Sequence, residues 1–159
     1  MIEISHTLLG FSSLIFGISV FVKPKGTRLH KCLGRLYLLS MLGLIISSFS
    51  LFEIFGTFGI FHFASLVSLW CISMGFRAVT MRHQKDDWLN DHFSYMAWSY
   101  IGLLGATSNE IYANISYFNQ LAKVHFWMPL ASLGIIFIVG GFVVHRLSKQ
   151  IAPLTSANT

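Results

Sequence analysis

The stretch LYLLSMLGLIISSFSLFEIFGTFGIFHFASLVSLWCISMGF, residues 36–76, contains one formal charge, on Glu53. A helix that crosses the hydrocarbon core of a bilayer needs about 20 apolar residues, so the stretch is long enough for two crossings. Gly56 and Gly59 follow the carboxylate closely, and such residues are typical of a tight turn. The stretch therefore predicts two membrane-spanning helices joined near Glu53.

The chain as a whole is also strongly apolar. Its 159 residues are 54% hydrophobic and only 11% charged, which lies outside the usual range of soluble globular domains. We expect one all-α integral membrane domain over residues 1–152 and a short disordered tail over residues 153–159. Five transmembrane helices are predicted, at residues 5–22, 33–55, 58–80, 93–115 and 126–144.

The positive charges predict the orientation of this bundle. Every Lys and Arg except Lys123 lies within residues 23–35, 77–85 or 146–149, which connect or follow alternate spans. Such segments face the cytoplasm, so we expect the N-terminus outside and the C-terminus in the cytoplasm of the bacterial inner (plasma) membrane. The net charge of +5 then reflects topology and attraction to anionic membrane lipids, and no nucleic-acid partner is expected.

A histidine lies at or near the start of each predicted span: His6, His30, His62, His92 and His125. Ionisable groups that border a membrane are costly and indicate function. The predicted topology puts His30 and His92 toward the cytoplasm and the other three toward the outside. His92 and Glu110 lie 18 residues apart on one helix, or about 27 Å, which argues against one shared reaction centre.

Paired histidines at two levels are what two b-type haems require, because each iron takes two imidazoles from facing helices. The pairs would be His30 with His92 and His62 with His125. Basic side chains near the inner pair would bind the haem propionates; they are Lys25, Arg28 and Arg35. We therefore predict haem b binding and transmembrane electron transfer, with a redox partner such as a quinone.

Two other functions fit the same residues. A zinc ion could be held by His6, His62 and His125 with Glu110 or a water as the fourth ligand, and an open fourth position would permit hydrolysis. The chain could instead be a small transporter, a lipid-binding subunit or an assembly partner in which Glu110 carries a proton. A bundle this small would have to form a homodimer to enclose a pathway. Whether the protein is an enzyme stays open at this stage.

Other chemistry is excluded or not indicated by the sequence. It contains no glycine-rich phosphate-binding loop, no nucleophile elbow and no HExxH motif, which argues against nucleotide hydrolysis and serine hydrolase chemistry. Cys32 and Cys71 form no CxxC pair and are predicted to be free thiols.

Two parts of the sequence resemble known groups of membrane proteins. Leu29-His30-x-x-Leu33-Gly34 is similar to a histidine-bearing helix start in cytochrome b561-type membrane proteins, which implies haem. A longer match runs from about His6 to Glu110. Its two blocks are Lys25-Gly26-x-x-Leu29-His30-x-x-Leu33-Gly34-Arg35-x-Tyr37 and His92-x-x-x-Met96-x-Trp98-Ser99-Tyr100-x-Gly102-Leu103-x-x-Ala106-x-x-x-Glu110.

These blocks resemble the DUF2306-like family of small predicted membrane proteins. The resemblance implies that six residues act as a set, namely His30, Arg35, His92, Ser99, Tyr100 and Glu110. It implies no particular activity. Some relatives are expected to have an arginine near the end of the fourth span, and Glu110 departs from that pattern.

Overall fold

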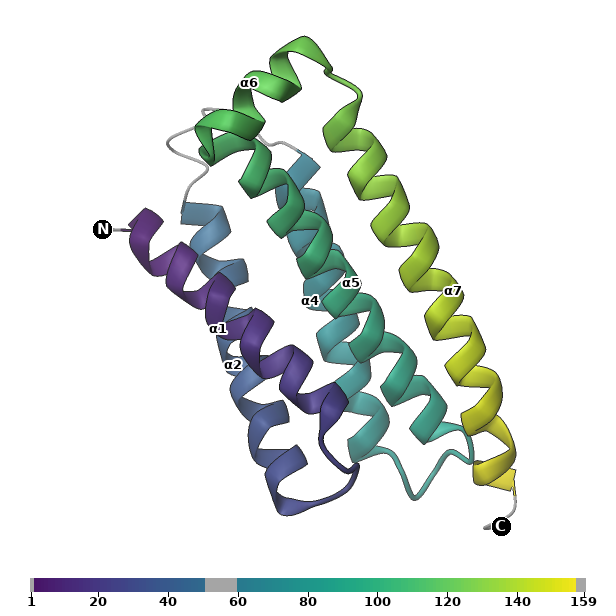
Figure 1. Ribbon diagram of the computed structural model, residues 1–159. Coiled ribbons are helices and arrows are strands. Elements are labelled where there is room, and N and C mark those ends of the chain that lie inside the picture. Colours follow the sequence, from purple (N-terminus) through teal and green to yellow (C-terminus); the bar gives the residue numbers. More distant parts are fainter. Residues whose placement is uncertain (1, 51–59, 157–159) are drawn as a thin grey trace. The chain divides into compact units, whose positions relative to one another are not determined.

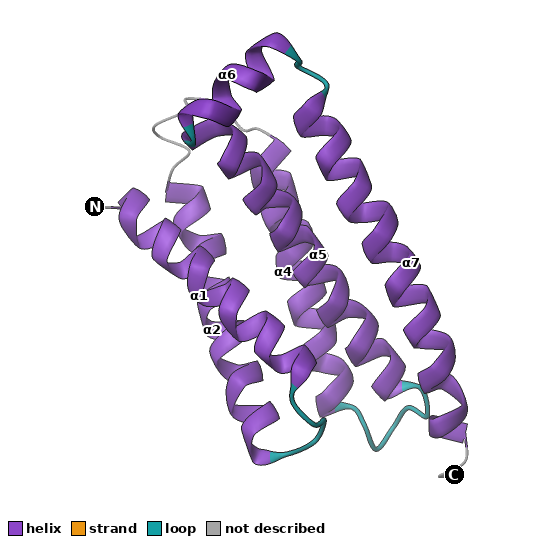
Figure 2. Cartoon of the chain, in the orientation of Figure 1, coloured by secondary structure: helices purple, strands orange, loops and turns teal. Residues whose placement is uncertain are grey.

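The computed structural model describes residues 2–50 and 60–156, and every regular element in these two ranges is an α-helix (Figure 2). The helices are α1 (Ile2–Val22), α2 (Arg28–Ser50), α4 (Ile60–Thr80), α5 (Trp88–Asn114), α6 (Ser116–Val124) and α7 (Met128–Ser156) (Figure 1). The predicted turn near Glu53 lies outside the described residues. The all-α prediction is confirmed for the part that is described.

Four helical segments are long and apolar enough to cross a membrane. They are Ile2–Val22, Arg28–Ser50, His62–Thr80 and Met128–Ile151. The fifth predicted span, residues 93–115, falls in α5, which has 27 residues but does not meet the same standard of apolarity within the described chain. Four candidate spans are therefore found where five were predicted.

The chain forms two compact units, Met1–Leu69 and Trp70–Thr159, and the division between them falls within α4. The prediction of one domain over residues 1–152 stays a prediction. At the other end of the chain, α7 continues through Pro153 to Ser156, so it includes the first part of the segment that was predicted to be a disordered tail.

In the first unit, a short turn joins α1 to α2. Gly26 has a φ of 77°, a left-handed conformation that glycine adopts without steric cost. Thr27 then caps α2, because its Oγ1 accepts a hydrogen bond of 3.1 Å from the His30 backbone N–H. The cap explains why α2 begins at Arg28, five residues before the predicted start at residue 33.

Small residues of α1 pack against α2. Ser13 has 0% of its surface exposed and Gly17 is also buried. From α2, a Cβ added at Gly43 would lie 3.1 Å from Leu9 Cδ2. Small side chains allow such close approach of helix backbones in membranes, where the hydrophobic effect between helices is absent.

In the second unit, α5 is covered by α7 along most of its length and contacts the last part of α4. A Cβ added at Gly140 of α7 would lie 2.7 Å from Ile101 Cδ1 of α5. From the α4 side, the Trp70 ring meets the Tyr95 ring edge-on, with centroids 5.3 Å apart. A helix covered on two sides has less contact with lipid, which explains why α5 can be less apolar than its neighbours.

The short helix α6 was not predicted. It links α5 to α7, and Figure 1 shows it at the end of this helix pair. Asn119 Nδ2 donates to the Ala113 carbonyl at 3.1 Å, and the Phe118 ring packs edge-on against Tyr112 with centroids 5.7 Å apart. These contacts fix α6 on the end of α5.

Candidate functional site

The ring of His92 is held by the main chain of another helix. His92 is the fifth residue of α5 and is half-buried. Its Nδ1 lies 2.8 Å from the Gly75 carbonyl oxygen of α4. A carbonyl oxygen only accepts hydrogen bonds, so Nδ1 carries the proton and a neutral ring has its lone pair on Nε2. Metal-binding histidines are typically oriented by such a bond from the second ring nitrogen.

Gly75 makes this contact possible. It is buried, and a Cβ added there would lie 2.6 Å from Met96 Sδ and 3.4 Å from Tyr95 Cβ. Met96 follows His92 by one helical turn, so the missing side chain lets α4 and α5 approach closely beside the imidazole. The packing of the two helices therefore sets the distance from the carbonyl oxygen to the His92 ring.

The start of α5 is also fixed by polar contacts next to His92. Asn90 Oδ1 accepts a hydrogen bond from Ser148 Oγ of α7. Asp91 Oδ2 accepts one from Lys85 Nζ at 3.2 Å, and both members of this ion pair are partly exposed. His92 therefore lies in a part of α5 that receives contacts from α4, from α7 and from the loop between α4 and α5.

In the first unit, His6 and Ser47 form a second histidine contact. His6 Nδ1 and Ser47 Oγ are 2.8 Å apart. The Ser47 hydroxyl already donates to the Leu44 carbonyl at 2.8 Å, so it accepts from the imidazole. His6 therefore also carries its proton on Nδ1.

Near this contact the first unit contains a further histidine and a serine pair. Ser48 and Ser65 are 2.9 Å apart. His62 is 6% exposed, and its ring centroid is 5.8 Å from that of Phe49. His6 and His62, which the sequence predicted to lie at one level toward the outside, thus both have partners from the last turns of α2.

Three other predicted haem-binding residues lie at the start of α2 or just before it. His30 is in the first turn of α2 and is half-buried, and Arg35 is exposed one turn later. Lys25 Nζ donates to the carbonyls of Val20 and Phe21 at 2.9 and 2.6 Å. It thereby caps the end of α1, and its burial there lowers the pKa of the ammonium group from the ordinary lysine value.

The predicted ligand pairs divide between the two units. His30 and His62 belong to the first unit and His92 and His125 to the second, so both haem pairs stay predictions. His125 is exposed where α6 ends. Among the described residues, no group of three or more His, Cys, Asp or Glu side chains is placed to hold a metal ion.

The predicted zinc ligands and the six residues implied by the family resemblance also divide between the two units. His6 and His62 fall in one unit and Glu110 and His125 in the other. Glu110 is exposed, and its Oε2 accepts a 2.7 Å hydrogen bond from Asn114 Nδ2. Ser99 is buried and donates to the Met96 carbonyl at 2.8 Å. Cys32 and Cys71 are free thiols, as predicted.

Comparison with known families decides what kind of protein this is. The family described as "Predicted membrane protein (DUF2306)" matches residues 4–148. The chain belongs to the DUF2306 family. The resemblance carried by the two histidine-led blocks is therefore confirmed, and the match extends through most of α7. With its apolar helices, this DUF2306 protein is a membrane protein. No curated protein and no solved structure matches it.

Sequence reasoning had singled out His92 but missed the residue that orients it. Gly75 is an isolated glycine in an apolar helix, and this pattern often marks a close backbone approach. The pattern does not identify the approaching helix, so the bond between His92 and Gly75 could be found only from the structure.

Proposed function

We propose that this DUF2306 protein binds haem b and moves electrons across the membrane, and that His92 is one of two imidazole ligands of the haem on the cytoplasmic side. The bond from His92 Nδ1 to the Gly75 carbonyl carries the proposal. Iron binding needs a neutral imidazole with a directed lone pair, and this bond supplies both the tautomer and the orientation. His30 is the proposed second ligand, and Lys25 and Arg35 are the proposed propionate partners.

A second haem on the outer side would use His62 and His125. The near-complete burial of His62 supports its part in this pair, because haem ligands lie within apolar surroundings. The bound haems would supply one-electron chemistry at two depths of the membrane. The protein would hold each iron, orient the imidazoles and exclude water, and a quinone is the proposed redox partner.

The proposal needs α5 to cross the membrane as a fifth span. In support, α5 and α7 are hydrogen-bonded at two distant points. Asn90 of α5 bonds to Ser148 of α7, and Ser108 of α5 bonds to Ser132 of α7. Asn90 and Ser108 are 18 residues apart in the sequence, or about 27 Å along the helix, which is close to the thickness of the hydrocarbon core. Since α7 is a candidate span, a helix beside it over this length would cross as well.

Five spans also satisfy the charge rule. If α5 did not cross, residues 77–85 and 146–149 would lie on opposite sides of the membrane, although both are basic. With five spans, all three basic segments face the cytoplasm and the N-terminus lies outside. Fusion of a reporter to each terminus would test this orientation.

The test of function is the absorption spectrum of the full-length protein purified in detergent from haem-supplied cells. We expect a Soret band, and α-bands after reduction by dithionite. His92→Ala should remove about half of the haem, because it removes a ligand of one of two sites. His83→Ala is the matched control, since His83 is exposed in the loop before α5 and should leave the spectrum unchanged.

Three outcomes would overturn the haem proposal. One is a colourless protein after haem supplementation. The second is stoichiometric zinc without haem, which would favour the set His6, His62, His125 and Glu110. The third is equal loss of haem in His92→Ala and His83→Ala. That result would mean that haem binding does not depend on the hydrogen bond between His92 and Gly75. A colourless protein without metal would favour transport, lipid binding or assembly.

A further inference from the structure

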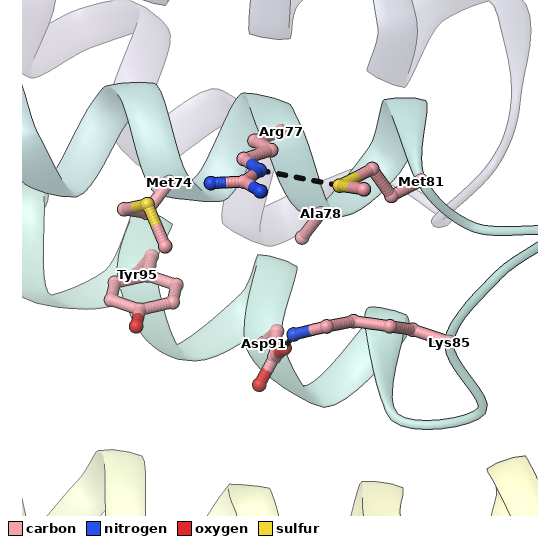
Figure 3. Close-up of a pocket in the computed structure, with 7 residues that line it drawn as sticks. All are labelled: Met74, Arg77, Ala78, Met81, Lys85, Asp91 and Tyr95. Atoms are coloured by element: carbon pink, nitrogen blue, oxygen red, sulfur yellow. Dashed lines mark hydrogen bonds and ion pairs between the residues drawn. The ribbon is translucent and has the colours of Figure 1, made fainter.

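A cavity of about 160 Å³ lies between the end of α4 and the start of α5. Figure 3 shows Arg77 and Met74 on the α4 side, Asp91 and Tyr95 on the α5 side, and the Lys85 side chain extending from the connecting loop to Asp91. Ala78 and Met81 complete the lining. All seven residues belong to the second unit, and none is a proposed haem ligand.

The two cations of this cavity are not equally engaged. Lys85 Nζ is paired with Asp91 Oδ2 at 3.2 Å. Arg77 Nε lies 3.2 Å from Met81 Sδ, and a thioether is only a weak acceptor. Within the described ranges no carboxylate forms an ion pair with Arg77. The Arg77 guanidinium therefore keeps N–H donors that no carboxylate of the described residues accepts. With two cations and one carboxylate, the lining has a net charge of +1.

The position and walls of the cavity select the kind of anion. Arg77 is in the last turn of α4, and the candidate span of this helix ends at Thr80, so the guanidinium lies at the level of lipid headgroups. Met74, Ala78 and the Tyr95 ring give the cavity an apolar side. A charged rim beside an apolar wall matches a molecule with an anionic head and a hydrocarbon tail.

We infer that this cavity binds a phosphate group, with Arg77 as the principal donor and Lys85 as the second cation, and that an anionic phospholipid supplies it. A guanidinium can bind two phosphate oxygens at once through parallel N–H groups. The Lys85 ammonium has further N–H donors beyond its bond to Asp91 and screens the bound phosphate from that carboxylate. The site is independent of the haem proposal.

The test is native mass spectrometry of the full-length protein, titrated with phosphatidylglycerol, phosphatidylcholine or inorganic phosphate. We expect phosphatidylglycerol to bind more tightly than phosphatidylcholine. Arg77→Met should weaken phosphatidylglycerol binding about tenfold, and Lys85→Met about threefold. Arg82→Met is the matched control, because Arg82 lies in the same loop but does not line the cavity; we expect less than a twofold change.

The arms of the experiment separate the sources of phosphate. Binding of inorganic phosphate that is lost in Arg77→Met, without tighter binding of phosphatidylglycerol than of phosphatidylcholine, would overturn the lipid as the source and identify the free anion instead. Equal effects of Arg77→Met and Arg82→Met would overturn the site, since only general surface charge would then be acting. Loss of Soret absorbance in Arg77→Met with unchanged phosphatidylglycerol binding would also overturn it, by assigning the guanidinium to the cofactor.

Discussion

His92 and His6 donate a hydrogen bond from the same ring nitrogen, but to different kinds of acceptor. His92 bonds to a main-chain carbonyl in a packed helix pair, whereas His6 bonds to the hydroxyl of Ser47. A hydroxyl can rotate or be removed by one substitution, but a helix carbonyl can be moved only by moving the helix. The comparison indicates that helix packing orients His92 and that a single side chain orients His6.

The largest effect is expected from Gly75→Val. The new Cβ would lie 2.6 Å from Met96 Sδ, and the added methyl groups force α4 away from α5. We expect a loss of about 2 kcal/mol in the free energy of unfolding, as is usual for overpacked sites. The measurement is thermal unfolding in detergent, together with the haem content.

Gly134→Val is the matched control, because a Cβ added at Gly134 in α7 would have no described side chain or other helix within 4 Å. It should change stability by much less than the substitution at Gly75. If the two variants were equally stable, the close approach at Gly75 would not be what holds His92.

A smaller effect is expected from Ser47→Ala. It removes the acceptor of the His6 Nδ1–H group and should cost about 1 kcal/mol, the usual contribution of a hydrogen bond. NMR of protein labelled with ¹⁵N in histidine should show a changed tautomer balance for His6 and none for His92. Ser12→Ala provides the control, since Ser12 Oγ donates within α1, to the Leu8 carbonyl. A change at His92 in Ser47→Ala would contradict the comparison.

The smallest effect is expected from Lys85→Ala. This substitution removes the ion pair with Asp91, whose members have 58% and 34% of their side chains exposed. Exposed pairs contribute little, so we expect a loss of no more than about 0.5 kcal/mol and an unchanged His92 spectrum. A loss as large as that of Gly75→Val would mean that charge, not helix packing, fixes the start of α5.

Much of the fold could be predicted because apolar runs long enough to cross a membrane are uncommon outside transmembrane helices. Residues 5–22, 33–55, 58–80 and 126–144 were placed by this signal, and α1, α2, α4 and α7 occupy the corresponding parts of the chain. The starts of α2 and α5 were placed too late, because the polar residues before His30 and His92 resemble a loop. The sequence of α6 is mixed and short, so it gave no clear signal.

The candidate site was less predictable, for a physical reason. Sequence spacing gives the position of His92 along its own helix, but it does not give the distance to Gly75, 17 residues earlier. That distance depends on how two helices pack. The same holds for Arg77 and Lys85, which seemed to be ordinary basic residues of a cytoplasmic loop until the structure brought them to one cavity.

The paired contacts between α5 and α7 also limit how the length of this chain can vary. Asn90 meets Ser148 at one end and Ser108 meets Ser132 at the other. Insertion of one residue between Asn90 and Ser108 would turn one end of α5 by about 100° against the other and shift it by about 1.5 Å. Both contacts could not then be kept. Insertions and deletions should therefore be tolerated in the loops around Gln84 and His125 and be absent from this part of α5.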